Sequence, residues 1–294
     1  MFPGQASKGV LDAITLARRL GGDDLLRLAT LGAVEPGDFE SGRAAHLVDR
    51  TEVLQPLLVA IALTIVAALE ARGTRPALVL GHSLGELSAW AAIGGLSPQA
   101  AVELARVRGE AMATVARARP GGMVAIATSD PSAIADALAA GRPHGDLDVA
   151  AYNAFDETVL TGDLAAIRAA ERVAPRAQRL RVAGAWHAPR MSSAADTFPA
   201  ALARTAHETS LRARLVTNGD GSIALAAEIP SRLAAQLTQP VAWTRCLTQA
   251  VHEGCTELVA IAPSATLRAL IIKHLDHLPE RPAIRVRTCD EVLS

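Results

Sequence analysis

A glycine-flanked serine between an apolar strand and an apolar helix constrains the fold of this chain most strongly. Residues 78–86 read Leu-Val-Leu-Gly-His-Ser-Leu-Gly-Glu and contain the pattern G-x-S-x-G. In such a nucleophile elbow, a sharp strand-to-helix turn exposes the serine hydroxyl, and small residues at Gly81 and Gly85 let strand and helix approach. The amide of Leu84 stays free at the helix N-terminus, where it favours a developing oxyanion. We predict that Ser83 is a nucleophile; the alternative is a chance match, against which the flanking strand and helix argue.

Length and composition bound the class of protein. The chain has 294 residues, half of them apolar, which suffices for one large domain with an added subdomain. Its formal net charge is -1 and 3% of its residues are aromatic, so we expect neither nucleic acid nor a membrane as partner. Three cysteines without metal-ligand spacing favour reduced thiols and a cytoplasmic protein. No basic region followed by an apolar stretch opens the chain, so we expect no secretory signal.

The longest apolar run, residues 57–69, is shorter than the roughly 20 residues that span a bilayer. We predict instead a buried helix over 56–72 with Pro56 at its first position. Alternating strands and helices elsewhere favour a mainly parallel sheet covered on both faces. The predicted strands are 2–5, 78–80, 213–217 and 257–261, and the other predicted helices are 9–20, 98–116, 230–237, one around Cys246, and 265–275.

A second, smaller unit is predicted between residues 121 and 187. The expected strands are 123–128, 147–154, 158–162 and 178–182, and the expected helices are 131–140 and 164–173. The resulting βαββαβ order is that of a ferredoxin-like fold. We therefore predict an α/β protein in which a ferredoxin-like subdomain, 121–187, is inserted into a large domain formed by 1–120 and 188–294.

One arginine falls on the apolar side of the helix predicted at 98–116. The apolar stripe of this helix includes Leu104 and Met112, and Arg108 lies on the same stripe. An unpaired buried charge is very unfavourable, so an inward guanidinium needs an anionic partner. That partner is either a carboxylate of the protein or one of a substrate; an arginine that extends out to solvent is the third possibility.

A serine nucleophile needs a general base, which is most often histidine. Of the eight histidines, His187 alone lies among small and apolar residues, where the subdomain rejoins the large domain. We select His187 as the candidate base, with a structural core histidine as the alternative. His82 is expected to point away from Ser83. His274 and His277 have a spacing that suits a metal, but we favour a solvated helix face and predict no metal site.

Eight segments stand in an order that is typical of one enzyme family. They are Phe2 to Gln5, Gln55-Pro56, Gly81 to Glu86, Arg108 to Met112, Gly121 to Ile126, Tyr152-Asn153 with Thr161-Gly162, Gly184 to His187, and Gln236-Leu237 with Pro240 to Trp243. On these segments, the chain resembles the malonyl-CoA:acyl carrier protein transacylases of fatty acid synthesis and the acyltransferase domains of polyketide synthases. Their combination is highly specific, although no single segment is. The fold that the resemblance implies is an α/β-hydrolase-like large domain, with the ferredoxin-like subdomain as the other wall of the cleft.

The resemblance implies a ping-pong reaction through a seryl ester. Ser83 would attack the thioester of malonyl-CoA, and His187 would take the serine proton and return it to the leaving thiol. His187 would later activate the phosphopantetheine thiol of an acyl carrier protein. Gln236 would orient His187 through a carbonyl oxygen, and the amides of Leu84 and Gln5 would form the oxyanion hole. No cofactor is implied, since malonyl-CoA is a substrate and the partner carries the phosphopantetheine.

The resemblance also implies how the substrate is held. Arg108 would grip the malonyl carboxylate with a two-pronged bond, so that the anion missing from its helix is the substrate. Gln55 and Trp186 are expected at the substrate as well. Trp186 stands where the family has smaller residues and should crowd an α-branched acyl group, which favours malonyl over other carboxyacyl units. Lys8 departs from the family, which usually has the sequence Gly-Ser-Gln where Ala-Ser-Lys stands here.

Other functions remain open on the sequence. An editing thioesterase of the same fold would share Ser83 and His187, and Arg108 argues against it because a plain acyl chain gives the arginine no task. A non-catalytic docking module for carrier proteins would not need the full set of site residues. The pathway is also open: the carrier protein belongs to fatty acid synthesis, to a polyketide assembly line or to malonate metabolism. We expect a monomer. A basic patch for an acidic carrier protein is a weaker expectation, with candidates Arg172, Arg176, Arg179 and Arg181.

Overall fold

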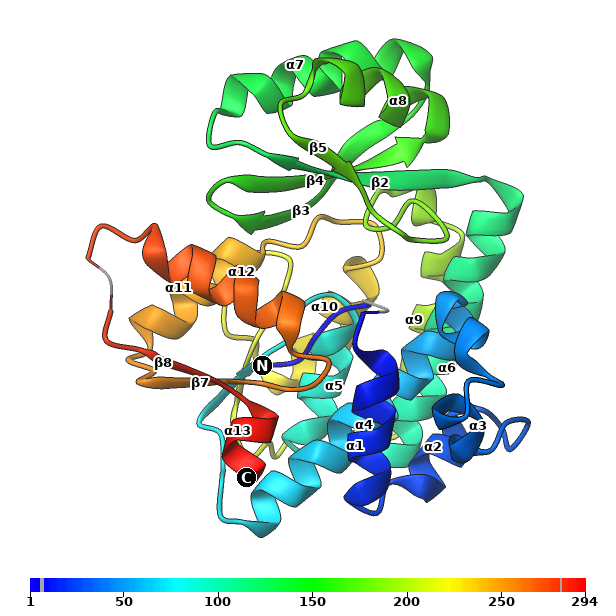
Figure 1. Cartoon of the computed structure of the whole chain (residues 1–294), viewed down its shortest axis with the longest axis vertical. Helices are drawn as coiled ribbons and strands as arrows, with labels where there is room; N and C mark the ends of the chain where they lie inside the picture. The colour runs from blue at the N-terminus through cyan, green and yellow to red at the C-terminus, as the bar shows by residue number, and fades with distance from the viewer. Residues whose placement is uncertain (6–7, 281) are drawn as a thin grey trace.

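The computed structural model describes residues 1–5, 8–280 and 282–294; Ala6 and Ser7, where the sequence differs from that of the family it resembles, lie outside them. A large α/β part carries a smaller α/β part at one end (Figure 1). The α/β class and the βαββαβ order of the smaller part are confirmed. The predicted boundaries at 120/121 and 187/188 stay a prediction.

The sheet of the large part is parallel and has the N-terminus at its centre. β1 (Leu78–Leu80) pairs in parallel with β6 (Arg214–Val216), and β7 (Glu257–Ala260) pairs in parallel with β8 (Arg285–Thr288). The amide of Phe2 donates to the carbonyl of Leu80 (3.0 Å), and the amide of Ile261 donates to the carbonyl of Met1 (2.9 Å). The first two residues thus lie between β1 and β7 and join the two pairs of strands. The strand predicted over 2–5 is reduced to one bridge, Phe2 to Gly81, because Pro3 lacks an amide donor.

Helices surround this sheet, and their bounds lie near those predicted. The chain order places α1, α2, α3 and α4 before β1, α5 and α6 after it, and the remaining helices of the large part after the smaller part. The sequence did not predict α2, α9, β8 or α13. The helices of the large part are α1 (Val10–Arg19), α2 (Asp23–Ala29), α3 (Pro36–Glu40), α4 (Thr51–Ala71), α5 (Leu84–Ala92), α6 (Pro98–Ala118), α9 (Ala194–Arg204), α10 (Ile229–Ala235), α11 (Trp243–His252), α12 (Ala265–Asp276) and α13 (Cys289–Leu293).

Helix α4 is long and apolar enough to cross a membrane, but it forms the centre of the core. In its most apolar window, 78% of the helix is buried inside the protein, where it packs against α1, α2, α5 and α6. The prediction that Pro56 begins the helix was wrong, since α4 begins at Thr51. A proline at the sixth position removes one hydrogen bond near the helix start, and the burial of the apolar turns that follow compensates for it.

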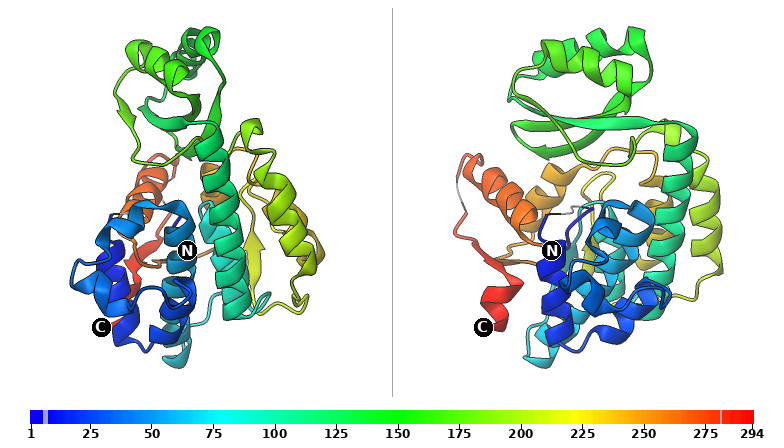
Figure 2. Two further views of the ribbon diagram at one scale, coloured as in Figure 1. Left: turned by 90° about the vertical axis from the view of Figure 1, so that its right-hand side faces the viewer. Right: turned by 45° about the vertical axis from the view of Figure 1, so that its right-hand side comes forward.

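The smaller part is a four-stranded antiparallel sheet in the order β3-β4-β2-β5, with two helices on its outer face (Figures 1 and 2). Val124 and Ile126 point to these helices, while Met123 and Ala125 point to the large part, as the two-residue period of a strand requires. Its elements are β2 (Gly121–Ala127), α7 (Pro131–Gly141), β3 (Leu147–Ala154), β4 (Glu157–Asp163), α8 (Leu164–Val173) and β5 (Ala177–Arg179).

The chain after α10 ties the two parts together. The amide of Val241 donates to the carbonyl of Ala150 (2.9 Å), and the amide of Tyr152 donates back to the carbonyl of Val241 (2.9 Å). These bonds extend the edge of the small sheet at β3 by a segment of the large part. The inner face of the small sheet is therefore held over the carboxyl end of β1, where the serine lies.

The glycines of the elbow are required because the backbones of three segments touch there. A Cβ at Gly85 would lie 2.3 Å from the carbonyl oxygen of Phe2, and one at Gly81 would lie 2.0 Å from the carbonyl group of Gly85. Both neighbours are backbone atoms that cannot turn away. The first residues of the chain, the elbow and α5 therefore pack together only with glycine at positions 81 and 85.

We expect Gly85→Ala to lower the free energy of unfolding by at least about 2 kcal/mol, because overpacked backbone must shift. Chemical denaturation measures this change. Gly37→Ala is the matched control: it also adds one methyl group, but its nearest contact would be a side-chain atom at 3.8 Å. An equal loss in both variants would contradict the steric account of the elbow.

Candidate active site

Ser83 is held in a strained turn at the junction of β1 and α5. Its φ is 52° and its ψ is -115°, a conformation that residues other than glycine rarely adopt. Asn218, which follows β6, fixes the turn from both sides. Its Oδ1 accepts from the amide of Ser83 (2.6 Å), and its Nδ2 donates to the carbonyl of Gly81 (2.6 Å). The turn is thus stabilised by a neighbouring strand end rather than by the elbow sequence alone.

The structure brings His187 to the serine. Its Nε2 lies 2.7 Å from Ser83 Oγ, and its Nδ1 lies 2.9 Å from the backbone carbonyl oxygen of Gln236. Because a carbonyl only accepts, Nδ1 carries the hydrogen and Nε2 is free to accept from the serine hydroxyl. His187 itself has a positive φ of 59° in the loop that leaves the small sheet. This arrangement can deprotonate the serine.

Burial keeps His187 neutral. Removal from water lowers its pKa to about 3, and the nearby positive charge of Arg108 contributes to the same shift. Above that pH, Nε2 has a free lone pair and can accept a proton. A negative charge placed between His187 and Arg108 would offset the positive charge of Arg108 and raise the pKa of His187, so an anionic substrate would strengthen the base.

Two backbone amides near the serine are available to an oxyanion. The amide of Leu84, the first residue of α5, and that of Gln5 have no acceptor among the described residues. The side chain of Gln5 is fixed separately, because its Oε1 accepts from the hydroxyl of Thr51 (2.7 Å). Unpaired donors at a helix start suit a developing negative charge.

The guanidinium of Arg108 lies behind Ser83 and is 2% exposed. It donates to Oε1 of Gln55 (2.8 Å), to Oε1 of Gln236 (2.9 Å) and to Oγ of Ser83 (3.3 Å). Within the described residues, no carboxylate lies within the 4.0 Å of an ion pair. Burial lowers the pKa of Arg108 to about 10, against the longer-range attraction of Glu86, and this still leaves the guanidinium charged at neutral pH. It also donates to Sδ of Met112 (3.2 Å), so the site contains a buried cation whose hydrogen-bond acceptors among the described residues are all neutral.

Gln236 does more than the sequence indicated. Its backbone carbonyl binds His187, while its side-chain oxygen binds Arg108. Its side-chain nitrogen donates to the carbonyl of Ser83 (3.0 Å) and to Oε2 of Glu86 (2.7 Å). Burial raises the pKa of Glu86 to about 7. One residue after α10 thus connects the base, the arginine and a buried carboxyl group.

A cavity of about 380 Å³ opens between the small sheet and the large part and contains Ser83 and His187. Met123 and Val159 line it from the small sheet, and Leu270 lines it from α12. Its size is within the range of small-molecule sites. A larger hollow of about 650 Å³ near the amino ends of β1 and β7 contains neither the serine nor the histidine.

Of the predicted substrate residues, Trp186 lines this cavity, whereas Arg108 and Gln55 do not. Trp186 is buried, and the half-buried Gln5, predicted at the oxyanion hole, lines the cavity too. Gln55 does not line the cavity; it is fully buried and supports Arg108 from behind. The ring of His82 lines the cavity too, but its Nε2 bonds Oδ1 of Asn153 (2.8 Å) rather than Ser83.

The remaining histidines contribute nothing to this site. The predicted solvated face at His274 and His277 was wrong for His274, which is buried beside Thr248 (3.3 Å) because α12 packs on α11. Among the described residues, no group of three or more His, Cys, Asp and Glu side chains could hold a metal ion.

The sequence did not single out Asn218 or the role of Glu86. Asn218 follows a predicted strand, and polar residues at the carboxyl end of a parallel strand are a general indication of a site. That signal could have found Asn218. Glu86 stands inside the quoted elbow, but nothing in its neighbourhood shows that it lies beside a residue 150 positions later.

A strained serine, a neutral buried histidine and free amide donors define a site for covalent acyl transfer on an α/β fold. Comparison with known proteins agrees with this class. Residues 11–288 match the family model of the acyl transferase domain. The chain belongs to this family.

Its relatives include a transacylase and a polyketide synthase. The chain is 32% identical over 283 residues to a malonyl CoA-acyl carrier protein transacylase of Mycolicibacterium smegmatis, covering 93% of this chain and 92% of the relative. It is 35% identical over 246 residues to the polyketide synthase GfsA of Streptomyces halstedii, covering 79% of this chain and 3% of that protein. The crystal structure of a malonyl-CoA:acyl carrier protein transacylase from Xanthomonas oryzae superposes with a TM-score of 0.86 at 28% identity and covers 98% of this chain and 92% of the other.

The lowered pKa of His187 predicts a pH profile. We expect the rate at which phenylmethanesulfonyl fluoride modifies Ser83 to stay within about twofold from pH 8 to pH 5, because the base remains neutral above a pKa of about 3. Arg108→Ala should move the acid limb of the profile to higher pH, since it removes a cause of the lowered pKa. An inflection near pH 6.5 in the unmodified protein would contradict the prediction.

Proposed function

We propose that this protein transfers a malonyl group from coenzyme A to the phosphopantetheine thiol of an acyl carrier protein, through an ester on Ser83. The observation that carries the proposal is the buried guanidinium of Arg108, which lies 3.3 Å from the serine hydroxyl and has no carboxylate within ion-pair distance among the described residues. An acyl group that ends in a carboxylate supplies that partner.

In the first half-reaction, Ser83 Oγ attacks the thioester carbonyl and His187 Nε2 takes its proton. The amides of Leu84 and Gln5 bind the oxyanion that develops on the carbonyl oxygen. His187 then gives the proton to the sulfur of coenzyme A, which leaves as the thiol. The Nδ1 bond to the carbonyl of Gln236 stabilises the charged ring in between.

In the second half-reaction, the thiol of the carrier protein replaces the thiol of coenzyme A. His187 takes its proton, the sulfur attacks the ester, and the proton returns to Ser83 Oγ. The carboxylate on Arg108 keeps the malonyl chain across the cavity between the two steps. The proposed chemistry uses only side chains, backbone amides and the two thiols, so it needs no cofactor.

Two features favour malonyl over other acyl groups. Arg108 favours a carboxyacyl group over a plain chain, which argues against an editing thioesterase. Trp186 lines the cavity next to His187 in the sequence, and we expect its large ring to crowd a branch next to the thioester carbonyl. A pure docking module is disfavoured because it would have no use for a strained serine within 2.7 Å of a neutral histidine.

The direct test is the mass of the intact protein after brief incubation with malonyl-CoA. We expect an increase that equals one malonyl ester, that is absent in Ser83→Ala, and that an acyl carrier protein with its phosphopantetheine arm removes. Loss of thioester without transfer to the carrier would favour a hydrolase. No adduct and no turnover would favour a docking module.

We expect Arg108→Ala to lower kcat/KM for malonyl-CoA by about 100-fold, or about 2.7 kcal/mol of transition-state stabilisation. The same variant should change the reaction with acetyl-CoA by less than about fivefold, because acetyl has no carboxylate. Arg106→Ala is the matched control, since Arg106 lies on the same helix and pairs with Glu103 and Glu110 at the surface. Equal losses with both thioesters would contradict the role of Arg108.

The mouth of the cavity supports a partner that carries phosphate. Lys8 and Arg181 line the cavity, are exposed and form no ion pair within the described chain. Coenzyme A and the carrier-bound arm both have a phosphate beyond the pantetheine unit. Arg179, by contrast, is paired with Glu171, which reduces the basic patch predicted on the small part.

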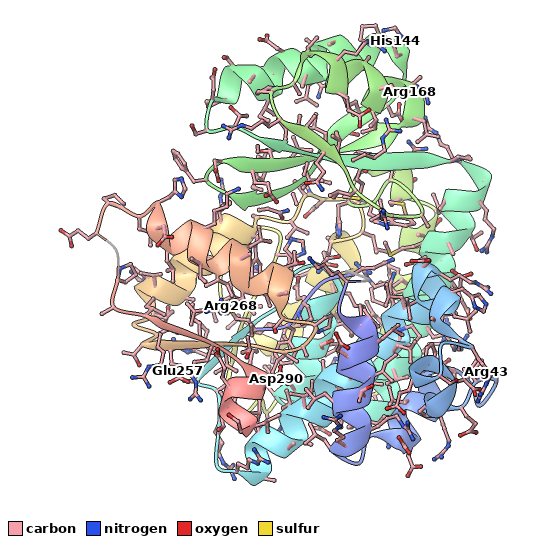
Figure 3. All side chains as sticks on the ribbon, in the orientation of Figure 1. Arg43, His144, Arg168, Glu257, Arg268 and Asp290 are labelled. Atoms are coloured by element: carbon pink, nitrogen blue, oxygen red, sulfur yellow. The ribbon has the colours of Figure 1, made fainter. Side chains whose placement is uncertain are left out.

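We expect Arg181→Gln to raise the KM for malonyl-CoA about threefold to tenfold at low salt, and less at 0.5 M salt, where charges are screened. Arg168→Gln is the matched control, because Arg168 lies on the outer side of the small part (Figure 3). A KM that changes equally in both variants, or that does not depend on salt, would contradict a phosphate contact at Arg181.

We also propose a cytoplasmic monomer. The site is built from one chain only, and all three cysteines are unpaired, as in a reducing compartment. Light scattering at micromolar concentration tests the oligomeric state, and a mass of two chains would contradict it.

A further inference from the structure

Glu86 is a buried ionisable group for which the proposed reaction has no use. It is the third residue of α5, is 1% exposed and forms no ion pair within the described residues. Two donors share one of its oxygens: the amide of Asn218 (3.1 Å) and Nε2 of Gln236 (2.7 Å) both point to Oε2. Its Oε1 is buried and has no partner among the described residues. A carboxyl group in such surroundings is unfavourable, so its presence needs an explanation.

The bond from Gln236 to Glu86 determines which way the Gln236 amide faces. A primary amide has a donor end and an acceptor end. The donor end meets two groups that accept, the carboxylate of Glu86 and the backbone carbonyl of Ser83. The acceptor end then faces Arg108, from which Oε1 accepts a bond of 2.9 Å. The reversed amide would set NH2 against the guanidinium and oxygen against both acceptors.

The direction of this amide decides which groups bind Arg108. With the oxygen toward it, the guanidinium is held by Gln55, Gln236 and the hydroxyl of Ser83, all of them uncharged. None of them competes with a carboxylate for the charge. A carboxylate at position 236 would instead pair with Arg108 directly and occupy the donors that the substrate needs. Glu86 orients the arginine through an amide without touching it.

We propose that Glu86 is a positioning residue, which fixes the Gln236 amide with its oxygen toward Arg108 and thereby makes the site selective for acyl groups that end in a carboxylate. The inference rests on the proposed malonyl transfer. In this account, Glu86 orients Gln236 and Gln236 orients Arg108. Arg108 alone touches the substrate. An ionised carboxylate suits this task better than an amide, because both of its oxygens accept, and the protonated group that a pKa of about 7 allows still has a carbonyl oxygen that accepts from Gln236.

Two conservative variants distinguish the need for a hydrogen-bond acceptor that reaches Gln236 from the need for a negative charge at position 86. Glu86→Gln keeps an acceptor oxygen at the same reach without the charge, and Glu86→Asp keeps the charge but is one methylene too short to reach Gln236. The readouts are the rate of the malonyl adduct on Ser83 from malonyl-CoA, and the rate of Ser83 modification by phenylmethanesulfonyl fluoride. The second reagent is neutral and depends on Ser83 and His187 but not on Arg108 as a carboxylate ligand.

We expect Glu86→Asp to slow malonyl adduct formation at least tenfold, and Glu86→Gln to slow it less than about fivefold, while both variants keep the sulfonyl fluoride rate within about threefold. Equal slowing of both reactions in Glu86→Asp would overturn the inference, because a purely structural role predicts it. Normal malonyl rates in Glu86→Asp would overturn it as well. If the unmodified protein forms no malonyl adduct, the proposed function itself fails; if the adduct forms and the variants behave alike, only the inference fails.

Discussion

A buried guanidinium without a carboxylate is the constraint on which the rest of the site depends. Arg108 is bound by neutral acceptors, and its three oxygen acceptors come from different elements: Gln55 from α4, Ser83 from the elbow and Gln236 from the chain after α10. The elements can meet there only because the glycines of the elbow let α5 pack against the first residues of the chain. The core helices and the central strand thus converge on one positive charge.

The same arrangement explains how the segment at Gln236 supports both the catalytic base and the arginine proposed to bind the substrate carboxylate. Gln236 orients His187 with its backbone and Arg108 with its side chain, so the base and the arginine share one support. The segment that follows Gln236 continues to Val241, which pairs with β3. The small sheet, which forms the other wall of the cavity, is therefore tied to the segment that holds the catalytic groups.

Local patterns predicted much of this structure. The elbow follows from a five-residue pattern, the order of the small sheet follows from the change of period after residue 121, and the inward position of Arg108 follows from helical spacing. The partners were harder to predict. The bonds from Ser83 to Asn218 and from Gln236 to Glu86 span 135 and 150 residues, and no local pattern shows which distant residues meet. Pro56 was misplaced because a packed core overrides a local start signal.

The central claim is that the malonyl carboxylate is the missing partner of Arg108. A crystal structure of the malonyl ester on Ser83, trapped before a carrier protein is added, tests it most directly. The account predicts that both carboxylate oxygens lie within hydrogen-bond distance, about 2.7–3.2 Å, of the Arg108 nitrogens and that the contact between Arg108 and Ser83 Oγ is broken. A carboxylate that faces the cavity mouth, with Arg108 still bound to its neutral oxygens, would contradict the account.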